Sequence, residues 1–220
     1  MGEALGLLFA RKVEWPRRRR VAIAPLAIAF VCLALLSVGC KRMQPLDTAP
    51  LDHTGMGYDA VQELKSLNVT PAEVAEMAQA RQAGLPDPDC VEVLRIYRGR
   101  GQAFSAGAAI AGMIQVGLRE DTLLELARLN QLDHGWGELQ AMRLARLSDA
   151  VVLEVARHHA EGRPVLSGAS LARLKNAGLR DATLLELARR GVPDSRADAI
   201  LSARRHRASD AEILRRFTGS

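Results

Sequence analysis

Aromatic residues and cysteines are scarce in this sequence. Phe, Trp and Tyr make up 4% of the 220 residues, so a core must be built mainly from leucine, alanine, valine and isoleucine. Of the three cysteines, only Cys90 lies after residue 40. A disulfide within the chain beyond residue 40 is therefore excluded, and so are zinc sites built from CxxC pairs. Cys90 occupies an apolar position of a helical pattern, which predicts a small buried side chain.

Motifs that mark common catalytic and metal sites are also missing. The sequence contains no HExxH helix, no glycine-rich phosphate loop and no GxSxG turn. His158 and His159 are adjacent, and neighbours on a helix point about 100° apart, so they cannot chelate one ion together. We therefore expect a protein that is not an enzyme and that carries no cofactor or metal. The alternative is an enzyme whose site is assembled from dispersed residues.

Charge is nearly balanced once the first 40 residues are set aside. The chain has 30 basic and 25 acidic side chains, and residues 1–40 hold six and two of them, which leaves 24 and 23. The pI of about 9.6 therefore comes largely from the N-terminal segment, and we expect no nucleic-acid partner. Residues 173–220 remain basic, with 11 basic and six acidic side chains. The arginines of this end that we consider as contacts for an anionic ligand are Arg189, Arg190, Arg204, Arg205, Arg207, Arg215 and Arg216.

The N-terminal segment has the pattern of an export signal. Four arginines at residues 17–20 precede an uncharged apolar run, residues 21–38, which ends at Gly39 and Cys40. The sequence LLSVGC at residues 35–40 resembles the lipobox of bacterial lipoproteins, with Ser37 where that family usually has leucine. The resemblance implies that the Cys40 thiol receives a diacylglyceryl group, that cleavage follows Gly39, and that the new amino terminus is acylated.

Several acyl chains on one residue give a durable membrane anchor. By the same resemblance, lysine rather than aspartate at position 41 favours the outer membrane, facing the periplasm, if the cell is Gram-negative. The alternative is that the apolar run stays uncleaved as a transmembrane helix. Positive charge before that helix would keep its N-terminus in the cytoplasm, so the rest of the chain is exported in either case.

Residues 41–57 separate this segment from the rest of the chain. They mix Pro, Gly, Thr and Asp without periodicity, which is typical of a flexible linker. We therefore expect a signal peptide over residues 1–39, a lipid-anchored tether over residues 40–57 and a helical domain over residues 58–220.

The predicted helical domain contains an internal repeat. Residues 117–128 (GLREDTLLELAR) return as residues 178–189 (GLRDATLLELAR), with ten of twelve positions identical at an offset of 61. The same offset pairs Gly107 with Gly168. Weaker half-repeats of about 30 residues lie inside this unit, with openings near residues 68, 84, 117, 146, 178 and 207. The sequence therefore predicts an all-α domain of repeated short helical hairpins, either a compact bundle or a short solenoid.

The repeated phrase predicts how the hairpins turn. Gly117 and Gly178 can adopt the left-handed conformation that ends a helix, after which the next leucine packs back on its last turn. Two positions have the spacing of a capping box, with Thr70 before Glu73 and Ser209 before Glu212. The sequence thus indicates units of helix, tight corner and helix.

Other features have mainly structural interpretations. Glu92, Glu125, Glu154 and Glu186 each precede an arginine by three residues, which predicts exposed ion pairs along the helices. The apolar stretch Phe104–Leu118 favours a closely packed central helix. Trp136, which lies between glycines, is the best single candidate for a contact with a partner, because tryptophan dominates many interfaces.

We expect a lipoprotein of the cell envelope that acts as a non-enzymatic helical scaffold or adaptor for a protein partner. The alternative is binding of an anionic envelope polymer or lipid through the basic C-terminal end.

Overall fold

The computed structural model describes residues 46–133 and 136–219, and this part of the chain is all-helical. It contains twelve α-helices and one short 3₁₀ helix, with no strand, which confirms the predicted fold class. Residues 45–220 form one compact unit. No helix in the described ranges is long and apolar enough to cross a bilayer. The predicted signal peptide and Cys40 lie outside the described residues.

The helices pair into six consecutive hairpins. Their bounds are α2 (Ala49–Asp52) and α3 (Tyr58–Ser66), α4 (Pro71–Gln82) and α5 (Asp87–Gly99), α6 (Gly107–Gln115) and α7 (Glu120–Arg128), α8 (Trp136–Leu144) and α9 (Asp149–Ala160), α10 (Gly168–Asn176) and α11 (Asp181–Arg189), and α12 (Ala197–Arg205) and α13 (Asp210–Thr218). The 3₁₀ helix η1 (Asp194–Arg196) precedes α12. We number these pairs as hairpins 1 to 6.

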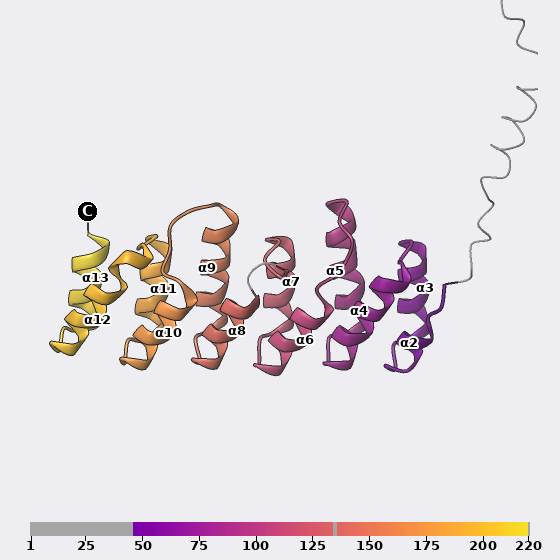
Figure 1. Ribbon diagram of the computed structural model, residues 1–220, viewed down its shortest axis with the longest axis horizontal. Coiled ribbons are helices and arrows are strands. Elements are labelled where there is room, and N and C mark those ends of the chain that lie inside the picture. Colours follow the sequence, from indigo (N-terminus) through magenta and orange to yellow (C-terminus); the bar gives the residue numbers. More distant parts are fainter. Residues whose placement is uncertain (1–45, 134–135, 220) are drawn as a thin grey trace, which may run out of the picture. The chain divides into compact units, whose positions relative to one another are not determined.

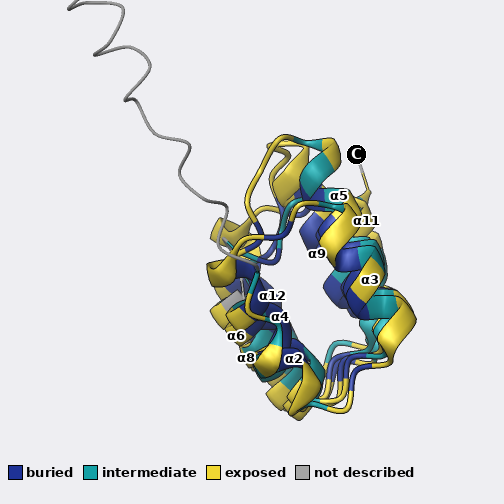
Figure 2. Ribbon diagram, turned by 90° about the vertical axis from the view of Figure 1, so that its right-hand side faces the viewer, coloured by how far each residue is buried: buried dark blue, intermediate teal, exposed yellow. Residues whose placement is uncertain are grey.

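The hairpins stack side by side and so form two layers of helices (Figure 1). The first helix of each hairpin packs on the first helix of the next, in the order α2, α4, α6, α8, α10, α12, and the second helices follow the same rule from α3 to α13. Viewed along the stack, the two layers enclose the buried residues between them (Figure 2). This arrangement is a short solenoid, in which each unit contacts its neighbours.

One hydrophobic core runs through all six hairpins. Eight of the described helices have only nine residues, and helices that short are marginal alone in water. They are stabilised by burying an apolar face, as where Leu184 and Leu187 of α11 are fully buried. The core is mainly aliphatic, with Tyr97 and Phe104 as its buried aromatic side chains among the described residues. Cys90 is also fully buried, as predicted, and burial raises the pKa of its thiol to about 12.

Left-handed residues end the helices throughout the stack. The six positions at which the sequence predicts corners all have positive φ, including Gly117 at 78° and Gly178 at 87°. After Gly117, the Leu118 amide donates back to the Met113 carbonyl at 3.0 Å, which is the hydrogen bond of a Schellman motif. Two of the corners have arginine in this conformation, Arg146 at 59° and Arg207 at 65°. The corner prediction at Gly117 and Gly178 is therefore confirmed, and the same conformation recurs at corners that have no glycine.

The N-terminal boundary differs from the prediction. Residues 49–52, within the predicted tether, form α2, where Leu51 is fully buried. Met56 is also buried. The predicted start of the helical domain at residue 58 is thus too late, because a four-residue helix gives no detectable periodicity and its apolar contacts come from α4.

The apolar stretch Phe104–Leu118 forms the closely packed helix that the sequence predicts, although the helix is shorter. It begins at Gly107, and Phe104 precedes it in the loop with a buried side chain. A Cβ atom at Gly107 would lie 2.1 Å from the Glu76 carbonyl oxygen of α4. Only glycine allows α6 to approach α4 this closely.

Candidate functional site: the C-terminal end of the stack

A charged pair recurs at the corner of most hairpins. A basic residue in the last turn of the first helix meets an aspartate that begins the second helix six residues later. We call this pair the corner clamp. Its members are Arg81 with Asp87 at 2.5 Å, Arg143 with Asp149 at 2.8 Å, Lys175 with Asp181, and Arg204 with Asp210 at 3.1 Å.

The clamp also joins each hairpin to the preceding one. Asp181 accepts a hydrogen bond from the Ser148 amide at 2.8 Å, and Asp149 accepts one from the Arg119 amide at 3.2 Å. These amides belong to the residue before a helix, where main-chain donors lack partners and a negative charge is stabilising. The aspartate of one hairpin thus caps the second helix of the hairpin before it.

The arginines of the clamp reach back in the same direction. Arg204 donates to the Gly178 carbonyl at 2.6 Å and Arg143 donates to the Gly117 carbonyl at 2.7 Å. The corner glycine of each hairpin therefore faces the hairpin that follows. Burial raises the pKa of Asp210, but hydrogen bonds from Thr183 and Arg180 and the charge of Arg204 outweigh it, so its pKa lies below the ordinary value.

The clamp was not predicted, although it leaves a recognisable pattern in the sequence. A basic residue followed six positions later by aspartate occurs at each clamped corner, but its partner amide lies about 30 residues away. Arg204, predicted as a contact for an anionic ligand, is instead engaged with Asp210 and three main-chain carbonyls.

The last described hairpin differs from the others on the side that faces away from the stack. Leu187 and Thr183 of α11 are buried against hairpin 6. At the corresponding positions, α13 has Arg216 and Glu212, which are exposed. Polar residues on the outer face are characteristic of the terminal unit of a solenoid.

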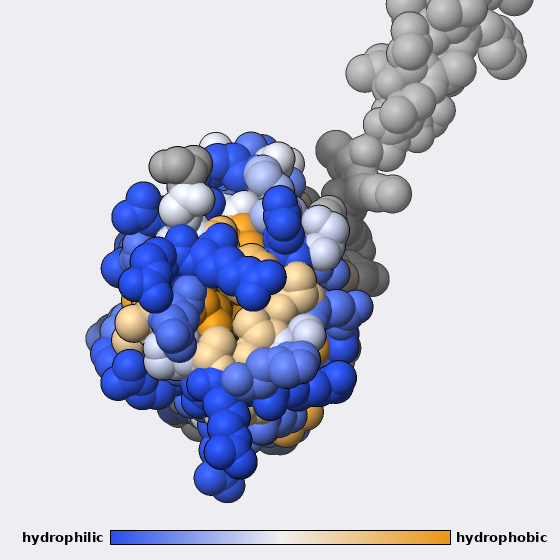
Figure 3. All heavy atoms as spheres, turned by 90° about the vertical axis from the view of Figure 1, so that its left-hand side faces the viewer, coloured by the Kyte–Doolittle hydropathy of each residue, from blue (hydrophilic) through white to orange (hydrophobic). Residues whose placement is uncertain are grey.

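A hollow remains on this outward side. Its volume is about 450 Å³. We call the surface around it the end face, which is lined by Ala203, His206, Arg207, Ala208, Glu212, Ile213, Arg215 and Arg216. Figure 3 shows apolar atoms at the centre of this end of the stack and hydrophilic side chains around them. The end face thus combines an apolar floor with a basic rim.

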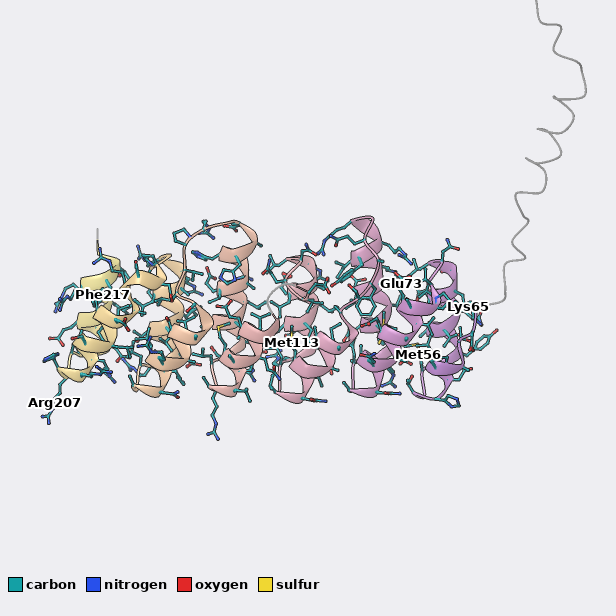
Figure 4. All side chains as sticks on the ribbon, in the orientation of Figure 1. Met56, Lys65, Glu73, Met113, Arg207 and Phe217 are labelled. Atoms are coloured by element: carbon teal, nitrogen blue, oxygen red, sulfur yellow. The ribbon has the colours of Figure 1, made fainter. Side chains whose placement is uncertain are left out.

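The arginines of the rim have few partners within the described residues. Arg207, Arg215 and Arg216 are exposed and form no ion pair there, and neither does the neighbouring Arg205. Arg207 projects away from the helices at the last corner (Figure 4). The Arg216 guanidinium lies 5.4 Å from the ring centre of Phe217, in the range of a cation–π contact. Four of the seven predicted arginines therefore gather at this end.

The main-chain donor at the last helix is already satisfied. The Ser209 amide donates to the Glu212 carboxylate at 2.7 Å, and the Ser209 hydroxyl accepts from the Glu212 amide at 3.3 Å. This is the predicted capping box, and the one at Thr70 and Glu73 is also present. Hydrogen bonds from Ser209 lower the pKa of Glu212. The Ser209 amide is therefore already engaged, unlike the amides of Arg119, Ser148 and Arg180, which donate to the aspartate of the next hairpin.

The remaining predicted residues are placed elsewhere or lie outside the described atoms. Arg189 and Arg190 line a separate hollow between hairpins 4 and 5. Trp136 is the first residue of α8, its side chain lies outside the described atoms, and its role as a contact stays a prediction. Three of the four predicted ion pairs at spacing three form, at 3.4 to 3.7 Å. The exception is Glu186, which pairs with Arg190 at 2.8 Å instead of Arg189.

Among the described residues, no group of three or more His, Cys, Asp or Glu side chains could hold a metal ion. No protein-family model matches the sequence, and no curated protein or solved structure matches it significantly.

Proposed function

We propose that this protein is a lipid-anchored helical scaffold of the cell envelope, which binds a protein partner through the end face. The observation that carries the proposal is the hollow of about 450 Å³, which has Ala203 and Ile213 in its lining and Arg207, Arg215 and Arg216 around it. A solenoid presents extended surfaces to proteins, and an apolar centre with a polar rim is the general form of a protein interface.

The chemistry of the end face specifies the partner. Ala203 and Ile213 lie beneath the hollow and leave only a small apolar area for contact, while the arginines favour negative charge around it. A helix or helical hairpin with an apolar stripe flanked by Asp and Glu meets both conditions. It would lie where a seventh hairpin would stack, but it would be held by the rim arginines rather than by a corner clamp.

The distance between the anchor and the end face fits a scaffold. Cys40 and Leu46, the first described residue, are six residue steps apart, and a chain of that length spans at most about 20 Å. Five steps between hairpins at about 9 Å each place the end face about 45 Å from hairpin 1. An anchor at Cys40 would therefore hold hairpin 1 near the membrane and leave the other end accessible to a partner.

Site-specific photo-crosslinking in cells tests the proposal. A photoreactive residue in place of Arg215 should yield one major crosslinked protein, and the same residue in place of Arg128 in the middle of the stack should not. Arg207→Glu should reduce the crosslink at least tenfold. Arg146→Glu is the matched control, because Arg146 is exposed at an equivalent left-handed corner 61 residues earlier, and it should change nothing.

The anchor requires its own measurement. Cys40→Ala should abolish labelling by a fatty-acid probe and release the protein from the membrane fraction. If Cys40→Ala leaves both unchanged, the lipoprotein assignment is wrong. If charge reversal at Arg207 and at Arg146 has the same effect on crosslinking, the end face is not the binding surface.

The second candidate is binding of an anionic polymer or lipid by the same arginines, which is favoured by the absence of ion pairs at Arg205, Arg207 and Arg215 within the described residues. It predicts salt-sensitive binding to anionic vesicles or polyphosphate, with no protein crosslink.

A further inference from the structure

Two loops at corresponding positions of the stack differ in how they are filled. In the loop after α5, the buried rings of Tyr97 and Phe104 pack edge to face with centres 5.3 Å apart. The Tyr97 hydroxyl donates to Asp133 at 2.8 Å. Arg100 also lies over the Tyr97 ring and donates to the Asn130 side chain at 3.0 Å. This first loop is therefore filled by the chain itself.

The corresponding loop after α9 has smaller side chains. At the offset of 61, His158 stands where the first loop has Tyr97, and Val165 stands where it has Phe104. A hollow of about 200 Å³ lies beside them. Its lining residues are His158, Arg163, Pro164, Arg189, Arg190 and Gly191. Three of these six are arginines and none is acidic.

Two of the three arginines have no basic counterpart in the first loop. Arg163 corresponds to Gln102 and Arg190 corresponds to Leu129, whereas Arg189 corresponds to Arg128. The second loop has therefore lost the Phe104 ring and has an imidazole in place of the Tyr97 phenol. It has gained Arg163 and Arg190, while Arg100 of the first loop is replaced by Glu161. Arginines that stabilise helix ends would not require the accompanying loss of the larger side chains, so the combined change points to a ligand.

His158 is the buried polar group of this hollow, with 1% of its surface exposed. Its Nδ1 donates to the Pro164 carbonyl at 3.0 Å, and its Nε2 has no hydrogen-bond partner. The Glu154 carboxylate lies 3.6 Å from Nε2, too far for a good hydrogen bond. The charged groups that face His158 are thus Glu154 on its own helix and the three arginines of the hollow.

The arginines are accessible to a ligand despite their neighbours. Arg190 pairs with Glu186 at 2.8 Å, and Arg163 pairs with Glu161. Both pairs are substantially exposed, and such pairs contribute little to stability. Arg189 forms no ion pair within the described residues. An oxyanion in the hollow can therefore recruit all three guanidinium groups without breaking a buried interaction.

We propose that this hollow between hairpins 4 and 5 binds a phosphate group, held by Arg163, Arg189 and Arg190 against the buried imidazole of His158. The forked donors of arginine match the oxygens of phosphate, and three arginines line this hollow. The phosphate belongs to a small phosphorylated molecule or to a lipid headgroup. The proposal is independent of the scaffold function and of the end face.

Titration of inorganic phosphate into the full-length chain in a neutral detergent tests the proposal, with nuclear magnetic resonance of the histidine rings as the readout. We expect a saturable shift of the His158 signals that sodium chloride at the same ionic strength does not reproduce. The other four histidines should respond weakly. The absence of a saturable His158 shift both with inorganic phosphate and with vesicles of phosphatidylglycerol would overturn the proposal.

Variants that copy the first loop separate binding from folding. His158→Tyr combined with Val165→Phe should fill the hollow with residues that this fold already accommodates in the first loop. We expect this variant to keep its thermal unfolding temperature and to bind phosphate at least tenfold more weakly. Because it removes the His158 signals, the amide signal of Gly191 serves as the readout. Equal affinity in the filled variant would assign the binding to another site.

Single arginine variants and vesicles complete the test. Arg189→Gln should weaken binding at least fivefold, and Arg128→Gln, its counterpart in the first loop, should leave it unchanged. Vesicles of phosphatidylglycerol are compared with vesicles of phosphatidylcholine. A shift of His158 with phosphatidylglycerol but not with inorganic phosphate identifies the headgroup as the source, and the reverse identifies a soluble phosphate. Equal loss of binding in Arg128→Gln and Arg189→Gln would contradict the proposed site.

Discussion

The two copies of the 61-residue unit, residues 90–150 and 151–211, show which contacts the stack requires and which it can exchange. Both have glycine where a first helix meets the previous hairpin, at Gly107 and Gly168. Their corners differ, however, because Ile114 and Glu120 of the first copy stand where the second has the clamp Lys175 and Asp181.

The exchange at this corner has a physical reason. Asp181 accepts the amide of Ser148, the residue that precedes α9. The residue that precedes α5 is Pro86, which has no amide hydrogen to donate. The carboxylate of Glu120 therefore has no main-chain amide at position 86 to accept from. The corner instead brings Ile114 against Gly84, whose Cβ position lies 4.0 Å from the isoleucine. Close backbone contact is thus common to both copies, while the chemistry of the corner varies with the donor available.

The largest expected effect comes from the contact that both copies share. Gly107→Ala should destabilise the protein by about 3 kcal/mol, because the new methyl group meets the main chain of Glu76, which cannot move aside. Gly168→Ala should cost about 2 kcal/mol, since the nearest atoms belong to the side chains of Glu138 and Met142. Chemical denaturation measures both values.

Gly99→Ala is the control for this pair. Gly99 lies at the end of α5 with open space around its Cβ position. Alanine there should stabilise the helix by about 0.5 kcal/mol. If Gly107→Ala were as mild as Gly99→Ala, the close approach of α6 to α4 would be wrong.

The exchanged corner should respond differently in the two copies. Asp181→Ala removes the partner of Lys175 and leaves the Ser148 amide without an acceptor, at a cost of about 1–2 kcal/mol. Glu120→Ala at the corresponding position should change stability by less than about 0.5 kcal/mol, because Glu120 is exposed and forms no ion pair within the described residues. Equal effects would show that the two corners are not distinct.

Low pH should reduce the difference in stability cost between the substitutions at Asp181 and at Glu120. Burial raises the pKa of Asp181, but hydrogen bonds from Lys175 and Ser148 outweigh it, so its pKa in the folded protein lies below the ordinary value. The unfolded chain then takes up the proton first as the pH falls. The contribution of Asp181 is complete above its ordinary pKa, near 4, and disappears as the pH falls through the lowered value.

The measurement is the stability difference between wild type and Asp181→Asn at pH 7 and at the lowest pH where both remain folded. This difference should shrink at low pH, whereas Glu120→Gln should stay close to wild type at both. A constant difference for Asp181→Asn would contradict the lowered pKa.

Local signals allowed most of the hairpins to be predicted from the sequence. The corner at Gly117 is encoded within a dozen residues, by a residue that tolerates positive φ and a leucine after it. The clamp could not be predicted in the same way, because Asp181 depends on a main-chain amide 33 residues earlier. The end face was found only in part. The sequence identified its arginines by composition, but it could not show that Arg204 is engaged in a clamp while Arg207 projects from the last corner.

The smallest effect concerns the corners that have arginine in the left-handed conformation. Arg146 and Arg207 occupy the same position of the two copies, with φ of 59° and 65°. A residue with a Cβ atom in this conformation destabilises the fold by about 1 kcal/mol. Glycine removes most of this strain, but it loses more conformational entropy on folding. Arg146→Gly and Arg207→Gly should each therefore stabilise the protein by about 0.5 kcal/mol in thermal denaturation. Only Arg207→Gly should also weaken capture of the proposed partner, since Arg146 lies outside the end face. A stabilising effect in one copy alone would mean that the two corners differ in their backbone, and loss of capture in both would move the binding surface away from the end of the stack.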